Sequence, residues 1–109
     1  MQTLKKNYEF QYLLSKGTYV AGRYIVIYYK KNRLAFNKIG IAISKKTGKS
    51  VVRNRLKRLC KEAYRTIEPV MLTKVDVVIL WKKSANPKEA NFFVIKEDIE
   101  KTMKKAGLI

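Results

Sequence analysis

The sequence predicts an α+β fold in which helices pack against a small mixed sheet. Two long segments, in the middle and at the end of the chain, carry apolar residues at helical spacing. Other segments are rich in β-branched and aromatic side chains, which favour strands. The order is helix, strands, helix, strand and helix, which suits two packed layers. The 109 residues are enough for one domain, residues 1–109, with a modest core.

A short first helix is predicted over residues 8–16. Asn7 is expected to cap this helix and Gly17 to end it. Its apolar face follows the spacing i, i+3 and i+4 and is formed by Phe10, Leu13 and Leu14.

Two strand segments are predicted next. Residues 18–30 are rich in aromatic and β-branched side chains and are interrupted by Gly22, which indicates one bent strand or two short ones. Residues 38–44 form a further strand, with Ile39, Ile41 and Ile43 on one face. We expect these two segments to pair antiparallel.

A long helix is predicted to begin near Ser50, a plausible cap, and to end at or before Glu68, because Pro69 follows. On a helical wheel its apolar residues form one stripe: Val52, Leu56, Leu59, Cys60, Ala63 and Ile67. Residues 75–81 are almost all apolar, as in a strand covered on both faces. After the Asn86-Pro87 break, a last helix closed by Gly107 is marked by Phe92, Ile95, Ile99, Met103 and Ala106.

The chain is strongly basic, with 25 Lys and Arg against 8 Asp and Glu and a formal net charge of +17. Within residues 45–65 the only acid is Glu62, and the nine basic residues are Lys45, Lys46, Lys49, Arg53, Arg55, Lys57, Arg58, Lys61 and Arg65. Arg53 and Arg55 flank the apolar stripe, while the opposite face carries Asn54, Lys57, Arg58, Lys61 and Arg65. Such a helix is typical of a nucleic-acid-binding surface.

Several kinds of chemistry are excluded. The chain has no histidine, so it lacks a histidine triad, a histidine base and a histidine-ligated zinc. One cysteine makes no metal cluster, and Cys60 in the apolar stripe is expected to be a buried structural thiol. Three acids of the last helix, Glu97, Asp98 and Glu100, are interpreted as a solvated face, with an Mg²⁺-binding acidic pair as the alternative. We therefore expect no catalytic residue and no metal site in the protein itself.

Aromatic residues gather near the start of the chain, where six of the seven tyrosines lie within the first 29 residues, beside Phe10. In the first strand, Tyr24, Val26 and Tyr28 are expected on one face, and Ile25, Ile27 and Tyr29 on the other. Exposed rings beside lysines form a stacking platform for unpaired bases. For each single ring, the alternative to stacking on a base is ordinary packing within the sheet. No apolar leader or membrane span is present in the sequence, and we expect a cytoplasmic protein.

The residues Ser44-Lys45-Lys46, followed by VVRNRLKRLCKEAYR over residues 51–65, closely resemble the protein subunit of bacterial ribonuclease P. The Arg-Asn-Arg core, the following Leu-Lys-Arg and the Ala-Tyr-Arg end match in order. The resemblance extends to Leu4-Lys5-Lys6-Asn7, Phe10, Gly17 and Arg23, and to the last strand and helix.

This resemblance implies an αβββαβα domain with a left-handed β-α-β crossover around the basic helix. The family partners a catalytic RNA that removes the 5′ leader of precursor tRNA, and its Mg²⁺ is expected to be bound mainly by RNA. The enzyme would thus be a ribonucleoprotein endoribonuclease whose catalytic centre lies in the RNA. Neither a membrane nor a small-molecule substrate is implied.

The resemblance also implies roles for individual residues. The catalytic RNA would be bound by Arg53, Asn54, Arg55, Lys57, Arg58, Lys61 and Arg65. The single-stranded leader would lie between the first helix and the sheet, against Phe10, Tyr28, Lys45, Lys46, Lys82 and Lys83. Many relatives carry a second aromatic residue on the first helix where this chain has Leu14.

Three other classes of protein are alternatives when the residues are considered without the resemblance. Composition by itself favours a structural RNA binder of the ribosomal-protein kind. A DNA reader would need a helix-turn before the basic helix, and an aromatic sheet suits unpaired bases better than a duplex groove. A nuclease acting alone is disfavoured by the missing histidines and the few acids.

Overall fold

The computed structural model describes residues 1–109, all of the chain. Its three helices are α1 (Asn7–Lys16), α2 (Ser50–Ile67) and α3 (Phe92–Ala106). Its five strands are β1 (Gln2–Thr3), β2 (Thr18–Ala21), β3 (Ile25–Lys31), β4 (Lys38–Ala42) and β5 (Val75–Trp81). Short 3₁₀ turns cover Lys45–Thr47, Glu68–Val70 and Pro87–Glu89. The α+β class and the order of the predicted elements are confirmed, and β1 is an addition that the sequence did not indicate.

The sheet is mixed, with strand order β1-β4-β5-β3-β2. β5 pairs parallel with β4 and antiparallel with β3. The expected antiparallel pairing of the segments 18–30 and 38–44 is therefore wrong, because β5 lies between them. β5 takes the centre because its side chains are apolar on both faces, and only a central strand is covered on both. The segment 18–30 forms two strands, β2 and β3, joined as an antiparallel hairpin.

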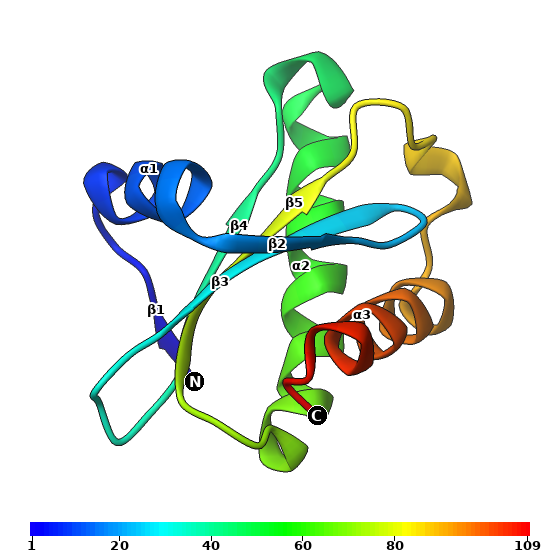
Figure 1. The fold of residues 1–109 in the computed structure, drawn as a ribbon. Helices are drawn as coiled ribbons and strands as arrows, with labels where there is room; N and C mark the ends of the chain where they lie inside the picture. Colours follow the sequence, from blue (N-terminus) through cyan, green and yellow to red (C-terminus); the bar gives the residue numbers. More distant parts are fainter.

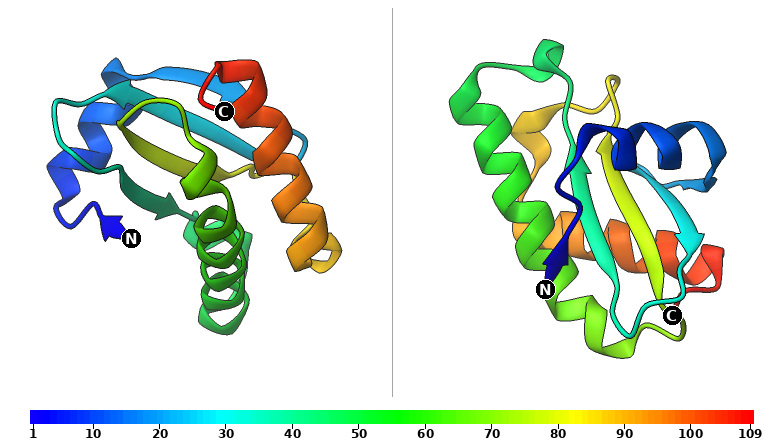
Figure 2. Two further views of the ribbon diagram at one scale, coloured as in Figure 1. Left: turned by 90° about the horizontal axis from the view of Figure 1, so that it is seen from below. Right: turned by 90° about the vertical axis from the view of Figure 1, so that its left-hand side faces the viewer.

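The connection from β4 through α2 to β5 is a left-handed crossover. Seen from the α1 side with both strands running upward, β5 lies to the right of β4 while α2 lies behind the sheet (Figure 2, right). Parallel β-α-β units are almost always right-handed. The rare hand agrees with the expectation drawn from the family resemblance.

Helices cover both faces of the sheet, with α1 on one side and α2 and α3 on the other (Figure 1). The larger core joins α2 and α3 to the sheet through side chains such as Leu56, Ile79 and Ile95. A smaller cluster of Leu4, Leu13 and Val78 lies beneath α1. The predicted burial of β5 on both faces is confirmed by Val77 and Ile79 on the larger core and Val78 on the smaller one.

Two helix starts differ from expectation. Asn7 is the first residue of α1, and the free backbone N–H groups of Lys5 and Lys6 donate to the Glu9 carboxylate at 3.3 and 3.1 Å. Ser50 is likewise the first residue of α2 and not its cap. The predicted ends hold: α2 ends before Pro69, and Gly107 closes α3 with a left-handed φ of 76°.

Asp98 is buried, so its interpretation as part of a solvated face is wrong. It projects from α3 toward the β2–β3 turn, where the Gly22 N–H already donates to the Ile25 carbonyl and the next three N–H groups are left to other acceptors. Its carboxylate accepts all three, at 2.7, 2.8 and 3.2 Å, from Arg23, Tyr24 and Ile25. A Cβ atom on Gly22 would lie 2.7 Å from the Asp98 Oδ1 atom, so glycine permits this close approach. α3 thereby fixes the hairpin turn.

Tyr24 also departs from the predicted alternation. It was expected on the face of Val26 and Tyr28, but it precedes β3 and lies in the larger core, stacked on Trp81 at 5.8 Å between ring centroids. Cys60 is buried as expected, and burial raises the pKa of its thiol to about 12. None of the helices is long and apolar enough to cross a membrane.

Candidate nucleic-acid interface

The outer face of α2 is a continuous basic surface. Its buried side carries Leu56, Cys60, Ala63 and Ile67, as predicted, while Val52 and Leu59 of the predicted stripe are partly buried. Tyr64 is also buried there, although it was not among the predicted stripe residues. Arg55, which flanks the stripe, is exposed, and so are all the residues predicted on the opposite face: Asn54, Lys57, Arg58, Lys61 and Arg65. Arg65 pairs with the only acid of this helix, Glu62, at 3.1 Å, and Arg53 is half-buried.

Arg53 and Arg55 each have a partner within the protein. The Arg53 guanidinium donates to the Gly48 carbonyl oxygen at 3.1 Å, which ties α2 to the loop before it. The Arg55 guanidinium donates to the carbonyl oxygen of the buried residue Ala90 at 2.8 Å. Arg55 therefore joins α2 to the segment that leads into α3, besides presenting charge to solvent.

A second surface lies on the other face of the sheet, beside α1. Neighbouring strands place Gly40, Val78, Tyr28 and Tyr19 in one row, over which α1 packs through Leu13. The next row toward the C-terminal ends of β4 and β5 is only partly covered and consists of Ala42, Leu80, Val26 and Ala21. We call these two rows, with Phe10 and Leu14 of α1, the open groove.

The aromatic residues of the open groove come from three elements. Phe10 and Tyr28 both pack against the Leu4, Leu13 and Val78 cluster and stay half-exposed, so the structure brings these two predicted residues together. A Cβ atom on Gly40 would lie 2.5 Å from the Phe10 ring, and glycine is thus what leaves space for that ring.

Tyr19 is a further ring of the open groove that the predicted site left out. Its centroid lies 5.6 Å from that of Tyr28, and its side chain is 65% exposed. In the sequence, the tyrosine-rich segment indicated that Tyr19 was a candidate. Only the pairing of β2 with β3, however, places Tyr19 on this face of the sheet.

The four predicted lysines lie at one edge of the open groove. β4 and β5 are parallel, so Lys45 and Lys46 after β4 and Lys82 and Lys83 after β5 follow strand ends on the same side of the sheet. The Lys82 ammonium donates to the Gly22 carbonyl oxygen, whereas the other three lysines are exposed. The edge therefore presents cations next to an aromatic surface, an arrangement that suits a single strand of nucleic acid.

A cavity of about 230 Å³ joins the two surfaces around the edge strands β1 and β4. It is lined by Phe10 and Gly40 on the side of the open groove and by Lys57 and Lys61 of α2 on the other. Residues from both predicted sets therefore meet at one place.

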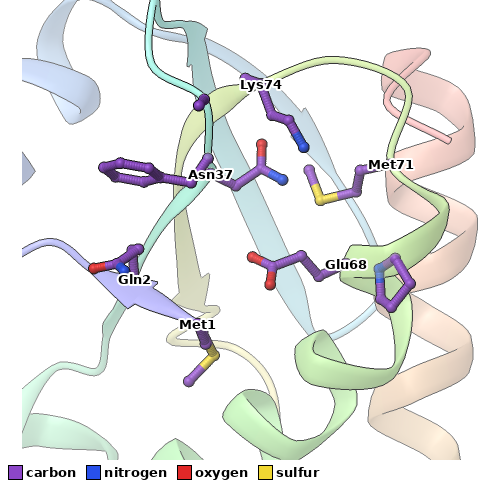
Figure 3. A pocket seen from close by; sticks show the side chains of 9 residues that line it. Met1, Gln2, Asn37, Glu68, Met71 and Lys74 are labelled. Carbon is purple, nitrogen blue, oxygen red and sulfur yellow. The ribbon is translucent and has the colours of Figure 1, made fainter.

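Another cavity, of about 380 Å³, opens at the other end of the strands, beside β1 and the residues that precede β4 and β5 (Figure 3). Two of its polar side chains already have partners: the Asn37 side-chain oxygen accepts from the Val75 N–H at 2.8 Å, and Glu68 accepts from the Tyr64 hydroxyl at 2.7 Å. It lies at the opposite ends of β4 and β5 from the four predicted lysines, and it brings no reactive group together. No group of three acidic or cysteine side chains that could hold a metal ion occurs in the chain.

Comparisons with known proteins agree on one family. The sequence model of the family described as Ribonuclease P matches residues 1–107. The ribonuclease P protein component of Caldanaerobacter subterraneus subsp. tengcongensis is 46% identical over 105 residues, covering 96% of this chain and 89% of that protein. That of Alkaliphilus metalliredigens is 40% identical over 106 residues, covering 97% and 94%.

Solved structures give the same result. The Staphylococcus aureus ribonuclease P protein matches with a TM-score of 0.85 at 28% identity, covering 99% of this chain and 97% of that one. The Thermotoga maritima protein, in complex with 1-(4-fluorophenyl)-2-thiourea, matches with a TM-score of 0.85 at 26% identity, covering 94% and 97%.

The fold, the basic helix and these similarities define a protein subunit of a ribonucleoprotein nuclease that processes tRNA. Within that class, the chain belongs to the ribonuclease P protein family. The resemblance noted in the sequence is confirmed.

Proposed function

We propose that this chain binds the catalytic RNA of ribonuclease P through the exposed face of α2 and holds the 5′ leader of precursor tRNA in the open groove. The protein then assists endonucleolytic removal of the leader while the RNA supplies the catalytic centre. The observation that carries the proposal is the separation of two surfaces, one basic and helical, the other aromatic and edged by lysines, on opposite faces of one sheet.

The two surfaces suit different forms of RNA. Guanidinium and ammonium groups along α2 match the phosphates of a folded RNA, whose bases are mostly paired. Rings on a sheet face match unpaired bases, which stack without regard to sequence. A leader differs from the rest of the tRNA in being single-stranded, so the open groove offers a physical basis for distinguishing precursor from mature tRNA.

We further propose that the Mg²⁺ used in cleavage is bound mainly by RNA. Seven of the eight acids already have a partner within the protein. The Glu9 carboxylate accepts from the Lys5 and Lys6 N–H groups, and the Asp98 carboxylate accepts from three backbone N–H groups. The other five with a partner are Glu62, Glu68, Asp76, Glu97 and Glu100. These acids do not converge on one point. The protein's contribution is to place the leader and the catalytic RNA relative to one another.

The leader assignment predicts the result of removing two rings. The double substitution Phe10→Ala and Tyr28→Ala should weaken binding of precursor tRNA to the assembled enzyme by about 1–3 kcal/mol for each lost stack. Binding of tRNA without a leader should stay unchanged, because no cation is removed. Fluorescence titrations with both tRNAs would measure the two affinities.

A matched control is the next residue of the same strand. Tyr29 is also half-exposed but faces the helices, so Tyr29→Ala removes an equivalent ring from the opposite face of β3. It should leave the preference for precursor tRNA intact. If the Phe10 and Tyr28 double variant keeps the full preference, these rings only pack the sheet and the leader lies elsewhere.

A further inference from the structure

The side of α1 that faces away from the open groove carries two tyrosines without a packing role. Tyr8 and Tyr12 are spaced i, i+4 and are 66% and 49% exposed. Beside them, the third row of the sheet consists of Lys38, Asp76 and Lys30. α1 thus divides this face of the sheet into the open groove and a second, more polar side.

Each of the two rings has a lysine next to it. The Lys30 ammonium donates to the Tyr12 hydroxyl and lies 4.6 Å from the ring centroid, and the Lys6 ammonium lies 5.8 Å from the centroid of Tyr8. A base stacked on either ring would therefore bring its phosphate within reach of a cation. We call Tyr8, Tyr12, Lys6 and Lys30 the outer platform.

The two acids beside the outer platform have partners of their own. Glu9 lies 3.5 Å from the Lys38 ammonium, and the Lys6 N–H, helped by the Lys5 N–H and that ammonium, lowers the pKa of Glu9. Asp76 accepts from the Asn32 amide at 2.9 Å. A hollow of about 640 Å³ is lined by both tyrosines and both acids, together with Gln11, Leu13 and Ser15. The ammonium groups of Lys6, Lys30 and Lys38 lie next to Tyr8, Tyr12 and Glu9 around it. These three cations outnumber the two acids, so the net charge around the hollow is positive, which favours a polyanion.

We propose that the outer platform binds unpaired nucleotides of the leader farther from the cleavage site than those in the open groove. This inference rests on the proposed function. Phe10 and Tyr12 lie on opposite sides of the same short helix, so a strand leaving the open groove meets the outer platform after crossing α1. The basic face of α2, by contrast, lies across the sheet, which makes the leader and not the catalytic RNA the occupant.

The test compares the affinities of the assembled enzyme for precursor tRNAs with leaders of different length. Single-strand binding sites span about 4–16 nucleotides, so precursor tRNAs with leaders of about 4 and about 12 nucleotides serve as short and long probes. The double substitution Tyr8→Ala and Tyr12→Ala should lower affinity for the long leader at least about fivefold and leave the short leader unchanged.

Two further variants control for the loss of an exposed ring and for the hydroxyl groups. Phe93 is 79% exposed on α3, across the sheet, so Phe93→Ala should change neither affinity. Tyr8→Phe with Tyr12→Phe keeps both rings and should bind the long leader as the unchanged protein does. A loss as large as that of the alanine variant would overturn the proposal, because stacking would not be the cause.

Two further outcomes of the leader-length experiment would also overturn the proposal. Equal loss with short and long leaders would place the contact on another part of the RNA and overturn the assignment to the leader. No loss with either leader would overturn the outer platform as a binding surface. The proposed function is judged separately: it fails if the unchanged protein does not favour precursor over mature tRNA, whatever the tyrosine variants do.

Discussion

Leu56→Ala is expected to lower the free energy of unfolding by about 2–5 kcal/mol. Leu56 is fully buried at the contact of α2 with the larger core, so the substitution leaves a cavity that its neighbours fill only in part. The loss would be a large share of the stability of a domain of this size. Denaturant unfolding followed by circular dichroism measures the change directly.

Arg58→Ala is the matched control on the same helix. Arg58 is exposed and has no hydrogen-bond partner within the protein, so its removal should change stability by less than about 0.5 kcal/mol while weakening RNA binding. If Arg58→Ala destabilises the protein as Leu56→Ala does, the orientation of α2 is wrong. Because Arg53 and Arg55 flank the apolar stripe, helical spacing alone predicts that Arg53→Ala and Arg55→Ala leave stability nearly unchanged. The structure changes that expectation for both residues: Arg53→Ala would lose the bond to the Gly48 carbonyl and Arg55→Ala the bond to the Ala90 carbonyl, at about 1 kcal/mol each.

RNA affinity is expected to fall steeply with salt, because the exposed charge of α2 acts through phosphates. Each neutralised phosphate contributes about −0.7 to −0.9 to the slope of log K against log salt. Removing two cations together, Arg58→Ala with Lys61→Ala, should make that slope shallower by about 1.4 to 1.8 if each cation meets one phosphate. Filter binding or fluorescence anisotropy across a salt series measures both slopes.

The same number of charges can be removed from another helix as a control. Lys104 and Lys105 are exposed in the last turn of α3, and Lys104→Ala with Lys105→Ala lowers the net charge equally. The slope should then stay close to its original value, because net charge alone forms no phosphate contact. A flat salt titration of the unchanged protein would contradict the account of α2.

Local periodicity predicted the helices and the central strand well, because their burial follows from side chains close in sequence. The stripe from Leu56 to Ile67 and the strand at Val75–Trp81 are examples. Sheet order could not be predicted in this way: whether β5 or β4 lies beside β3 depends on contacts across about fifty residues. The left-handed crossover came from the family resemblance alone.

Single polar residues were harder to place. Asp98 was grouped with its acidic neighbours, although on the wheel it lies beside Thr102 and close to Ile95, both buried, so a helical wheel drawn for α3 would have placed it toward the core. The Arg55 bond to Ala90 spans 35 positions and had no signal in the sequence.

The two candidate surfaces differ in how far their residues could be predicted from the sequence. The charged residues of α2 follow from helical spacing, and the structure exposes them as expected. The open groove needed the strand register, because only the pairing of β2, β3 and β5 puts Tyr19, Tyr28 and Leu80 on the same face. The cavity that joins Phe10 to Lys57 and Lys61 depends on packing around the β4 edge and could not be foreseen.

The most direct measurement of the central claim is cleavage of precursor tRNA by the cognate catalytic RNA at low Mg²⁺, with and without this protein. The account predicts that adding the protein raises the cleavage rate, because its cations lower the repulsion between catalytic RNA and substrate and its open groove holds the leader. An unchanged rate, with the protein folded and bound to the RNA, would contradict it.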